Sequence, residues 1–395
     1  MTPKRAVFLL SLLLGIQPVT TDLYLPALPG ITQELGVQMS QAQFTLSALL
    51  LAFGISQLAW GPLSDRWGRR PILLWGLFVY ALTGIGCMLA TSMTQLIVWR
   101  TLQGAAMGAV VMCGRAIVRD LYQPEHGARM MSKALTGLGF IACASAPLGG
   151  LLSDVWNWRV ALSVLALFGL FNLAIVAFWF QESAKRKNRH ALRPIFLFRT
   201  WWNIVRHPTF IAFSAVTIGS YGALFAFLST SSFVFIEQLG LTRSHYGLLL
   251  FSTAFVYLLG TLLCRQLLKR LDVHRTVAIG GALSLLGGGL TAIHAWLGWH
   301  SVLALMSPFY LFMLGHGIHQ PCGQSGAVGP FPRAAGAASA LGGFLMMSAA
   351  FLTGLWLSQH ADGKLYPMVN ALAFWCVITA LSAWFLVFPR RVVRG

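Results

Sequence analysis

Charged residues are scarce in this sequence. Only 10% of its 395 residues are Asp, Glu, Lys or Arg, whereas 57% are hydrophobic and the mean hydropathy is +0.71. In soluble globular domains roughly a quarter of the residues are charged, because their surface is in contact with water. The shortage excludes a chain whose whole surface faces water, and it predicts an all-α polytopic membrane protein whose main solvent is lipid.

Acidic residues are scarcer than basic ones. The chain has 28 Lys and Arg residues against 10 Asp and Glu residues, which gives a net charge of +18 and a pI near 10.5. Such a balance could indicate a nucleic-acid partner, but the sequence has neither a basic helix nor an aromatic RNA-binding signature. Few acids are left to orient a histidine in a hydrolytic triad, so we do not expect an enzyme.

Several other signatures are missing. No G-x-x-x-x-G-K-[ST] phosphate loop occurs, so ATP hydrolysis is not expected as the energy source. The six cysteines form no C-x-x-C pair and all fall in apolar stretches, so the sequence predicts neither a disulfide framework nor a zinc site. We expect no metal and no cofactor. The cysteines are Cys87, Cys113, Cys143, Cys264, Cys322 and Cys376.

Twelve apolar stretches are long enough to span a bilayer. We place them at 6–28, 44–60, 71–90, 96–118, 134–152, 160–180, 210–236, 246–268, 277–296, 302–321, 334–357 and 368–388. Lys4 and Arg5 before the first stretch resemble the start of a secretory signal, but no clear small-x-small cleavage site follows. We therefore expect the first stretch to remain as a span.

The basic residues are distributed unevenly between the two sides of these spans. If the amino terminus is cytoplasmic, 24 of the 28 Lys and Arg residues lie in cytoplasmic connections or adjacent helix ends. The four on the opposite side are Arg100, Arg159, Arg243 and Lys364. The positive-inside rule predicts this asymmetry, so we expect both termini to be cytoplasmic and the net charge to reflect topology, not a partner.

A basic stretch divides the spans into six and six. It predicts an N-terminal bundle over 1–181, a cytoplasmic linker over 182–207 and a C-terminal bundle over 208–395. Two bundles of equal size suggest an internal duplication. A shift of 199 residues places Gly260 and Arg265 under Gly61 and Arg66, which is weak support.

The connection between the second and third spans carries the most specific motif. Residues 61–71 read GPLSDRWGRRP, which resembles the G-x-L-x-D-R-x-G-R-R signature of the major facilitator superfamily. The resemblance implies twelve transmembrane helices in two pseudo-symmetric six-helix bundles. It also implies a cytoplasmic gate made by this loop and the end of the fourth span. The alternative to a gate is that the charged residues of this loop only set the orientation of the protein in the membrane. The gate residues are Gly61, Asp65, Arg66, Gly68, Arg69, Arg119 and Asp120.

Two further segments resemble the Bcr/CflA-type multidrug exporters. They are TDLYLPALP at 21–29 and RAIVRDLY at 115–122. This resemblance extends over essentially the whole chain. It implies proton-coupled efflux of small amphiphilic drugs by a monomer in the bacterial inner membrane, with protons, substrate and lipid as partners and the proton gradient in place of a cofactor.

Asp22 is the acid that we place inside an apolar span. A carboxylate there is costly unless it is paired or hydrated, so it is the candidate proton carrier. It could instead cap backbone groups near Pro26. Arg100 and Gln103 lie in an R-x-x-Q-G sequence that resembles the superfamily's antiporters. Our hypothesis is that Arg100 pairs with Asp22, although Arg100 could also reach the outer interface.

Aromatic and polar residues in the spans could line a permissive cavity. The candidates are Tyr24, Gln103, Arg115, Tyr221 and Phe225. Aromatic residues more often pack helices together or anchor them at the interface. Arg115 could equally serve the cytoplasmic gate.

The fifth and tenth spans contain further candidates. Pro147, Gly149 and Gly150 form a shortened version of the antiporter signature, which permits a kink and close helix packing. His316 and His319 stand three residues apart, so they share one helix face and could shuttle protons or contact substrate. Histidines in such positions are more often neutral interior groups.

Two other functions remain open from the sequence. The same fold could move a specific metabolite or nutrient, and substrate-induced proton release would discriminate between the two. A receptor or channel would need a signalling domain or show conductance, and the sequence contains no cytoplasmic signalling domain.

Overall fold

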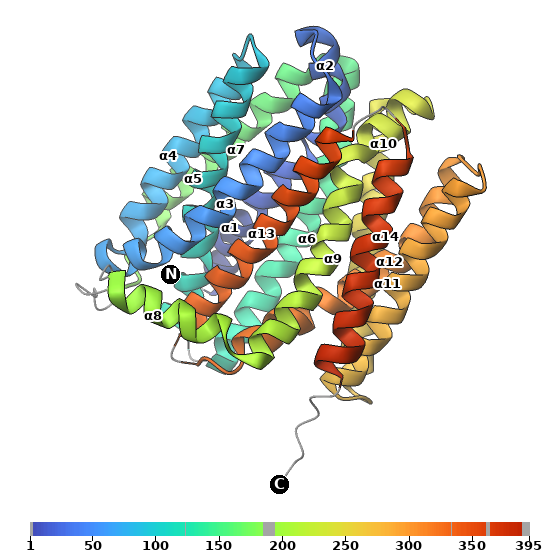
Figure 1. Ribbon diagram of the computed structural model, residues 1–395. Helices are drawn as coiled ribbons and strands as arrows, with labels where there is room; N and C mark the ends of the chain where they lie inside the picture. Colours follow the sequence, from blue (N-terminus) through green and yellow to red (C-terminus); the bar gives the residue numbers. More distant parts are fainter. Residues whose placement is uncertain (1–2, 123, 185–193, 333, 361–363, 389–395) are drawn as a thin grey trace. The chain divides into compact units, whose positions relative to one another are not determined.

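The computed structural model describes residues 3–122, 124–184, 194–332, 334–360 and 364–388, and all regular secondary structure in these ranges is helical (Figure 1). The helices are α1 (Pro3–Asp22), η1 (Leu25–Ala27), α2 (Leu28–Leu35), α3 (Met39–Trp67), α4 (Arg69–Met88), α5 (Met93–Leu121), α6 (Pro124–Val155), α7 (Trp158–Trp179), α8 (Pro194–Val205), α9 (Pro208–Ser232), η2 (Phe233–Gln238), α10 (Arg243–Leu268), α11 (Val273–Trp296), α12 (Val302–Val328), α13 (Ala335–Gln359), α14 (Tyr366–Leu381) and η3 (Ser382–Val387).

Twelve helical segments of the described chain are long and apolar enough to cross a membrane, so the predicted number of spans is confirmed. The first predicted span differs in detail. α1 ends at Asp22, and the chain turns through η1 before α2 begins. Pro26 and Pro29 lie in this segment and cannot donate backbone hydrogen bonds, which explains why the helix does not continue unbroken. α8 lies inside the predicted linker and was not predicted.

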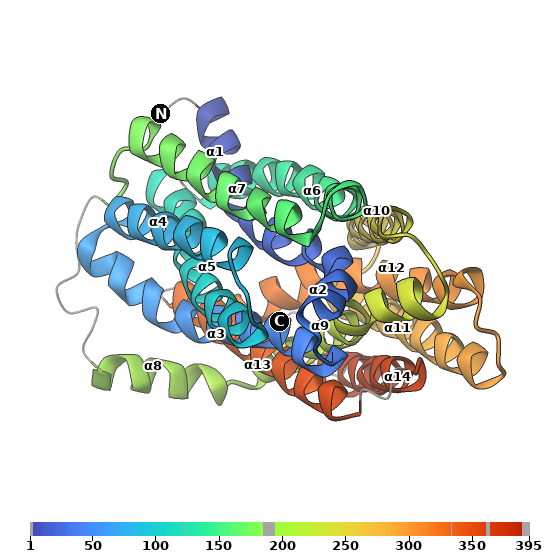
Figure 2. The ribbon, with the colours of Figure 1, turned by 90° about the horizontal axis from the view of Figure 1, so that it is seen from above.

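The chain folds into two compact units. The first comprises residues 1–198 and 242–251, and the second comprises 199–241 and 252–395. In the first unit α1 packs on α6, and α4 packs on both α5 and α7 (Figure 2). In the second unit α9 packs on α13, and α11 packs on both α12 and α14. The same three pairings therefore occur in both units, which confirms the predicted pseudo-symmetric arrangement.

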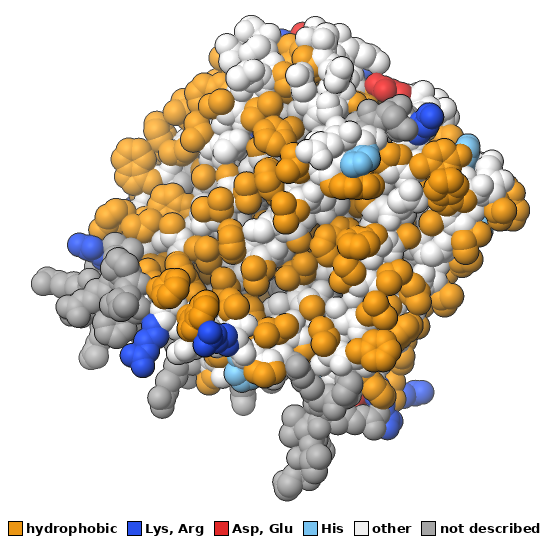
Figure 3. All heavy atoms as spheres, in the orientation of Figure 1, with side chains coloured by type: hydrophobic (Ala, Val, Ile, Leu, Met, Phe, Trp, Pro, Cys, Tyr) orange, Lys and Arg blue, Asp and Glu red, His pale blue; other side chains and the backbone are white. Residues whose placement is uncertain are grey.

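Large hydrophobic side chains lie on the outside of the helices. Phe178 is 85% exposed, Leu303 is 76% exposed and Phe140 is 75% exposed. Hydrophobic side chains cover the flanks of the helices on the face in Figure 3, and Lys and Arg side chains lie near the helix ends. Exposed apolar area of this kind is unfavourable in water but is satisfied by lipid tails.

Candidate functional site

The turn between α3 and α4 depends on one glycine. Gly68 has a φ of +106°, a backbone conformation that residues with a Cβ rarely adopt. Its N–H donates to the carbonyl of Ser64 at 3.0 Å, which closes the last turn of α3. A Cβ added to Gly68 would lie 2.9 Å from the carboxylate carbon of Glu182. Gly68 therefore permits both the turn and the close approach of the Glu182 side chain.

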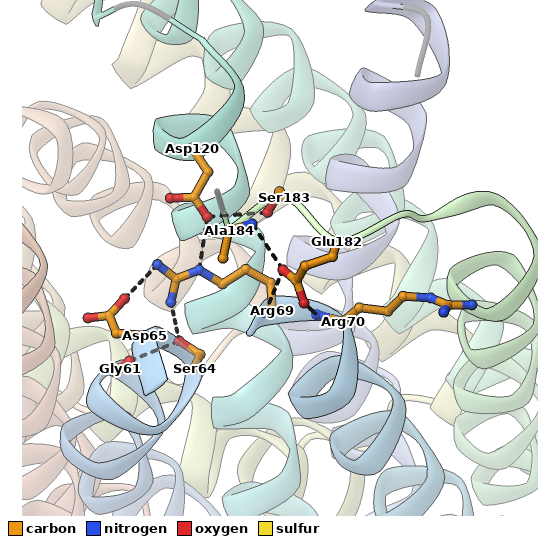
Figure 4. A network of polar contacts seen from close by, with 9 residues as sticks. All are labelled: Gly61, Ser64, Asp65, Arg69, Arg70, Asp120, Glu182, Ser183 and Ala184. Carbon is orange, nitrogen blue, oxygen red and sulfur yellow. Dashed lines mark hydrogen bonds and ion pairs between the residues drawn. The ribbon is translucent and has the colours of Figure 1, made fainter. Parts of the chain in front are cut away.

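Arg69 is the centre of a polar network at this turn (Figure 4). Its guanidinium contacts the Asp65 carboxylate at 2.5 Å and donates through Nε to Asp120 at 2.9 Å. A third contact runs from Nη1 to the Ser64 hydroxyl at 2.5 Å. The Arg69 side chain is 6% exposed, so the pairs are partly screened from water and are stronger than ordinary surface ion pairs.

Glu182, which follows α7, caps the N-terminus of α4. Its two carboxylate oxygens accept from the backbone N–H groups of Arg69 at 2.9 Å and Arg70 at 3.1 Å (Figure 4). The first N–H groups of a helix have no partner inside the helix and carry partial positive charge, so an acid is favourable there. Ser183 then donates to Asp120 at 3.2 Å. The segment after α7 is thus joined to α4 and α5.

The other predicted gate residues are placed differently. Arg66 is exposed and lies outside this network. Gly61 lies inside α3 and takes part through its backbone, since its carbonyl accepts from the Ser64 hydroxyl at 2.9 Å (Figure 4). A Cβ at Gly61 would meet Met112 in ordinary contact at 3.7 Å. The backbone of Arg119 belongs to α5, but its side chain lies outside the part of the chain that the structure describes. Every contact of the network described above lies within the first unit.

Arg100 forms a second polar centre, buried in the first unit. It is 0% exposed and donates to the Gln103 side chain at 2.8 Å and to the Thr20 carbonyl at 2.9 Å. Its guanidinium carbon lies 4.1 Å from the centre of the Tyr24 ring, which is a cation–π contact. Its Nε has no hydrogen-bond partner among the described residues, and no ion pair to a described carboxylate was found. The Arg100 side chain therefore lies in the interior of the first unit, where groups of α1 and α5 bind it.

Hydroxyl groups extend the Arg100 centre. The Tyr24 hydroxyl is 2.6 Å from the Thr45 hydroxyl, and the Thr20 hydroxyl is 2.7 Å from the Tyr80 hydroxyl. Thr20, Thr45 and Tyr80 were not identified from the sequence. Single hydroxyl residues in apolar spans are common, and nothing local distinguishes those that face a buried cation.

Asp22 is the last residue of α1 and is half-buried. Its Oδ1 accepts from the Thr21 hydroxyl at 2.7 Å. No ion pair joins Asp22 to Arg100 within the described part of the chain. Arg100, on α5, instead binds the last turn of α1 through the carbonyl of Thr20, two residues before Asp22.

The candidate cavity residues fall in both units. Tyr24, Gln103 and Arg115 belong to the first unit, and Tyr221 and Phe225 lie on α9 in the second. Tyr24, Gln103 and Phe225 are buried, whereas Arg115 and Tyr221 are half-buried. The structure brings Tyr24 and Gln103 together around Arg100.

The Pro147 segment is a close-packing element within a continuous helix α6. A Cβ at Gly149 would lie 2.8 Å from the carbonyl carbon of Leu23, and one at Gly150 would lie 3.0 Å from that of Arg243. Both glycines therefore admit backbone from other segments of the first unit. Small residues play this part in membrane helix packing generally.

An acid at the end of α6 caps α10 in the same unit. Asp154 accepts from the backbone N–H groups of Arg243 at 3.2 Å and Ser244 at 2.6 Å. The Arg243 guanidinium donates in turn to the Ser153 carbonyl at 2.8 Å. Neither Asp154 nor Glu182 was singled out in the sequence. Glu182 could have been, because it is the one acid in the basic stretch 182–207.

The two histidines of α12 lie in the interior of the second unit. His316 is 4% exposed and its Nδ1 is 2.8 Å from the Ser220 hydroxyl. His319 is 0% exposed and its Nε2 is 3.4 Å from the Val277 carbonyl. These contacts are those of hydrogen-bonded interior groups. No group of three or more His, Cys, Asp or Glu residues suited to a metal ion occurs in the described ranges.

The family model of the Major Facilitator Superfamily matches residues 10–354. The chain belongs to the major facilitator superfamily. The superfamily predicted from residues 61–71 is thereby confirmed, and with it a multi-pass membrane protein of a transporter family.

Curated relatives match this superfamily member over most of its length. It is 26% identical to the "Bicyclomycin resistance protein homolog" of Haemophilus influenzae, with 100% of both chains covered. It is 29% identical to "Multidrug resistance protein D" of Escherichia coli, with 94% of both covered. It is 27% identical to the "Chloramphenicol resistance protein" of Pseudomonas aeruginosa, over 83% of this chain and 78% of that one. Such relatives are those that the resemblance to Bcr/CflA-type exporters predicts.

A solved structure supports the fold. The crystal structure of a D-xylose-proton symporter superposes with a TM-score of 0.75, covering 96% of this chain and 97% of the other at 14% identity. At this identity the likeness concerns the fold alone.

Proposed function

We propose that this protein exports small amphiphilic compounds, drugs among them, in exchange for protons by alternating access between its two units. Support for the substrate class comes from the relatives named for bicyclomycin, multidrug and chloramphenicol resistance, which match 83% or more of the chain. The apolar character of the spans fits substrates that partition into lipid. On this proposal the protein lies in the bacterial inner membrane with both termini in the cytoplasm.

The observation that carries proton coupling is the buried Arg100. A buried cation is costly when no carboxylate is paired with it, and here the compensation comes from an amide, a carbonyl and an aromatic ring. A negative charge on Asp22, at the end of the helix that Arg100 already contacts, would stabilise this cation. Protonation of Asp22 would remove that attraction, so the protonation state would change how α1 and α5 are held together.

The proposed cycle assigns a role to each polar centre. Protons enter from the outside and bind at Asp22, and their release to the cytoplasm is coupled to outward movement of the substrate. The Arg69 network would stabilise the cytoplasmic ends of the helices in the first unit while the exit path is open. This assignment is supported by the contacts of Arg69 with Asp65, Ser64 and Asp120.

Substitution of Asp22 tests the coupling. Purified protein in liposomes with an imposed pH gradient should accumulate ethidium or chloramphenicol, and Asp22→Asn should reduce accumulation to the level seen with a protonophore. Asp22→Glu is the matched control, because it keeps a carboxyl group and should retain part of the transport. Binding of ethidium, followed by its fluorescence, should persist in all three proteins. Unchanged gradient-driven uptake by Asp22→Asn would show that the proton carrier lies elsewhere.

The same liposomes test the substrate class. The wild-type protein should move at least one phenicol, sulfonamide or cationic dye against its concentration gradient. A wild-type protein that binds and moves none of them, yet releases protons on addition of a single metabolite, would favour the metabolite transporter over the drug exporter.

A further inference from the structure

Two cysteines on different helices of the second unit face each other. Cys264 on α10 and Cys322 on α12 place their sulfur atoms 3.4 Å apart. Both are free thiols, and they are 2% and 3% exposed. They are 58 residues apart in the sequence, so no local motif brings them together.

The helix crossing beside this pair fixes the separation of the two helices. Gly260 lies one turn before Cys264, and a Cβ added to it would lie 2.6 Å from the Leu314 carbonyl oxygen. Gly317 precedes Cys322 on the facing helix, and a Cβ there would lie 2.7 Å from the α-carbon of Gly260. The backbones of α10 and α12 are therefore in close contact at Gly260 and Gly317. This close crossing places the side chains of Cys264 and Cys322 opposite each other. A small change in the rotamer of either cysteine alters the distance between the two sulfur atoms.

Two converging thiols are a chelating pair for thiophilic centres. Soft thiolate ligands select soft metals and metalloids over hard oxygen-preferring cations. A structural zinc site needs four ligands, and no third His, Cys, Asp or Glu completes a group here among the described residues. A linear two-coordinate ion binds two sulfur atoms on opposite sides of the metal, which holds them far apart. Pyramidal trivalent arsenic binds two sulfur atoms on the same side, which holds them close together. The short sulfur separation fits the second geometry.

We propose that Cys264 and Cys322 form a binding site for trivalent organic arsenicals, which bridge α10 and α12. With a monosubstituted arsenoxide, two arsenic–sulfur bonds form and the arsenic–oxygen double bond breaks. The two thiol protons leave with the oxygen as one water molecule, and no atom changes oxidation state. The cysteines themselves are 2% and 3% exposed, although their sequence neighbours Arg265 and Pro321 are exposed, so the reagent chosen to reach them is uncharged.

The test uses phenylarsine oxide and the folded protein in detergent. In a variant with Cys87, Cys113, Cys143 and Cys376 replaced by Ala, the reagent should add once per chain by intact mass. It should also remove two maleimide-reactive thiols, counted after unfolding. Chelation by two sulfurs should make release in a monothiol wash roughly 100-fold slower than release from a single cysteine. The dithiol 2,3-dimercaptopropanol should restore both thiols.

The matched controls are C264S and C322S in the same background, each of which keeps one of the two thiols. Both should lose the wash-resistant adduct while eluting as folded protein on gel filtration. Should the four-fold Ala variant not fold, digestion of the treated wild-type protein should yield an arsenic-bridged pair of peptides containing Cys264 and Cys322. The proposal is overturned if either Ser variant keeps the resistant adduct, if the bridge maps to other cysteines, or if the reagent binds only after unfolding.

Discussion

Arg69 is a buried cation that contacts carboxylates from two neighbouring helices, α3 and α5, while its own backbone begins α4. Arg66, three residues earlier in the same motif, is exposed. The two arginines differ little in the sequence motif but greatly in surroundings. Removing one partner of a buried ion pair leaves the remaining charges uncompensated, whereas surface ion pairs contribute little.

We expect Arg69→Ala to destabilise the protein by about 3 kcal/mol, chiefly because Asp120, whose side chain is 17% exposed, is left without its cation, whereas Asp65 is 44% exposed and can be hydrated. Arg66→Ala is the matched control and should melt close to the wild type, since its side chain faces solvent. Thermal unfolding in one detergent, followed by tryptophan fluorescence, measures both. Equal melting temperatures for the two variants would contradict a structural role for the network.

At the residue scale the sequence identified Asp65, Arg69, Asp120 and Arg100, because each is a charge in a recognisable motif. It missed Glu182 and Thr20 for a physical reason. Their partners are far away in the chain: Glu182 binds the backbone of Arg69, 113 residues earlier, and Thr20 binds Arg100, 80 residues later. The proposed Asp22–Arg100 pair named residues on two packed helices, α1 and α5, that form no ion pair in the described part of the chain; Arg100 instead binds the carbonyl of Thr20, two residues before Asp22.

The N-terminus of α4 is stabilised by residues that do not belong to the helix. Gly68 supplies the turn, and Glu182 supplies two acceptors for N–H groups that the helix itself cannot satisfy. The two residues also lie close together, because a Cβ added to Gly68 would lie 2.9 Å from the carboxylate carbon of Glu182. Their effects on stability should therefore be coupled.

A double-mutant cycle measures this coupling. We expect Glu182→Ala to cost about 1 kcal/mol through loss of the cap, with faster hydrogen exchange at Arg69 and Arg70. Gly68→Ala should cost at least about 1 to 2 kcal/mol, since both its φ and the space are unfavourable. The double variant should cost less than the sum, because the collision is gone. Gly36→Ala is a comparison for positive φ without a steric contact: its φ is +63° and no atom lies within 4 Å of its Cβ, although its ψ is 37°, against 163° at Gly68. Strict additivity at 68 and 182 would refute the contact.

Hydropathy predicted the long elements well and the short ones poorly. All twelve spans have counterparts in the structure, because about 20 apolar residues are a strong and local signal. η1 was absorbed into the first predicted span, which ends at residue 28, and α2 begins at that residue and was not predicted. α8 was hidden in a stretch assigned to the linker by its charge. Short helices depend on proline positions and on neighbours, which a 20-residue window averages away.

At the scale of the whole molecule, α10 belongs to both units. Residues 242–251 group with the first unit, and the rest of the helix groups with the second. The start of α10 is held by Asp154 through two backbone N–H groups. These contacts lie within the first unit, so they fix the first turn of α10 to the end of α6.

We expect Asp154→Ala to free that turn, and hydrogen exchange at Arg243 and Ser244 should become roughly fivefold faster, which corresponds to a lost cap worth about 1 kcal/mol. Ser153→Ala is the matched control. Its hydroxyl is buried without a partner in the described chain, and its backbone carbonyl still accepts from Arg243. Exchange that is unchanged in Asp154→Ala, or equally faster in Ser153→Ala, would show that the contacts do not hold the helix.

The Glu182 contact also sets an order in biosynthesis. The α3–α4 turn leaves the ribosome 113 residues before the acid that caps it. At usual rates of translation, roughly 6 to 23 s pass before Glu182 is made. During that interval the first N–H groups of α4 must be satisfied by water or lipid headgroups. The first unit can therefore complete its polar network only after α7 has been synthesised.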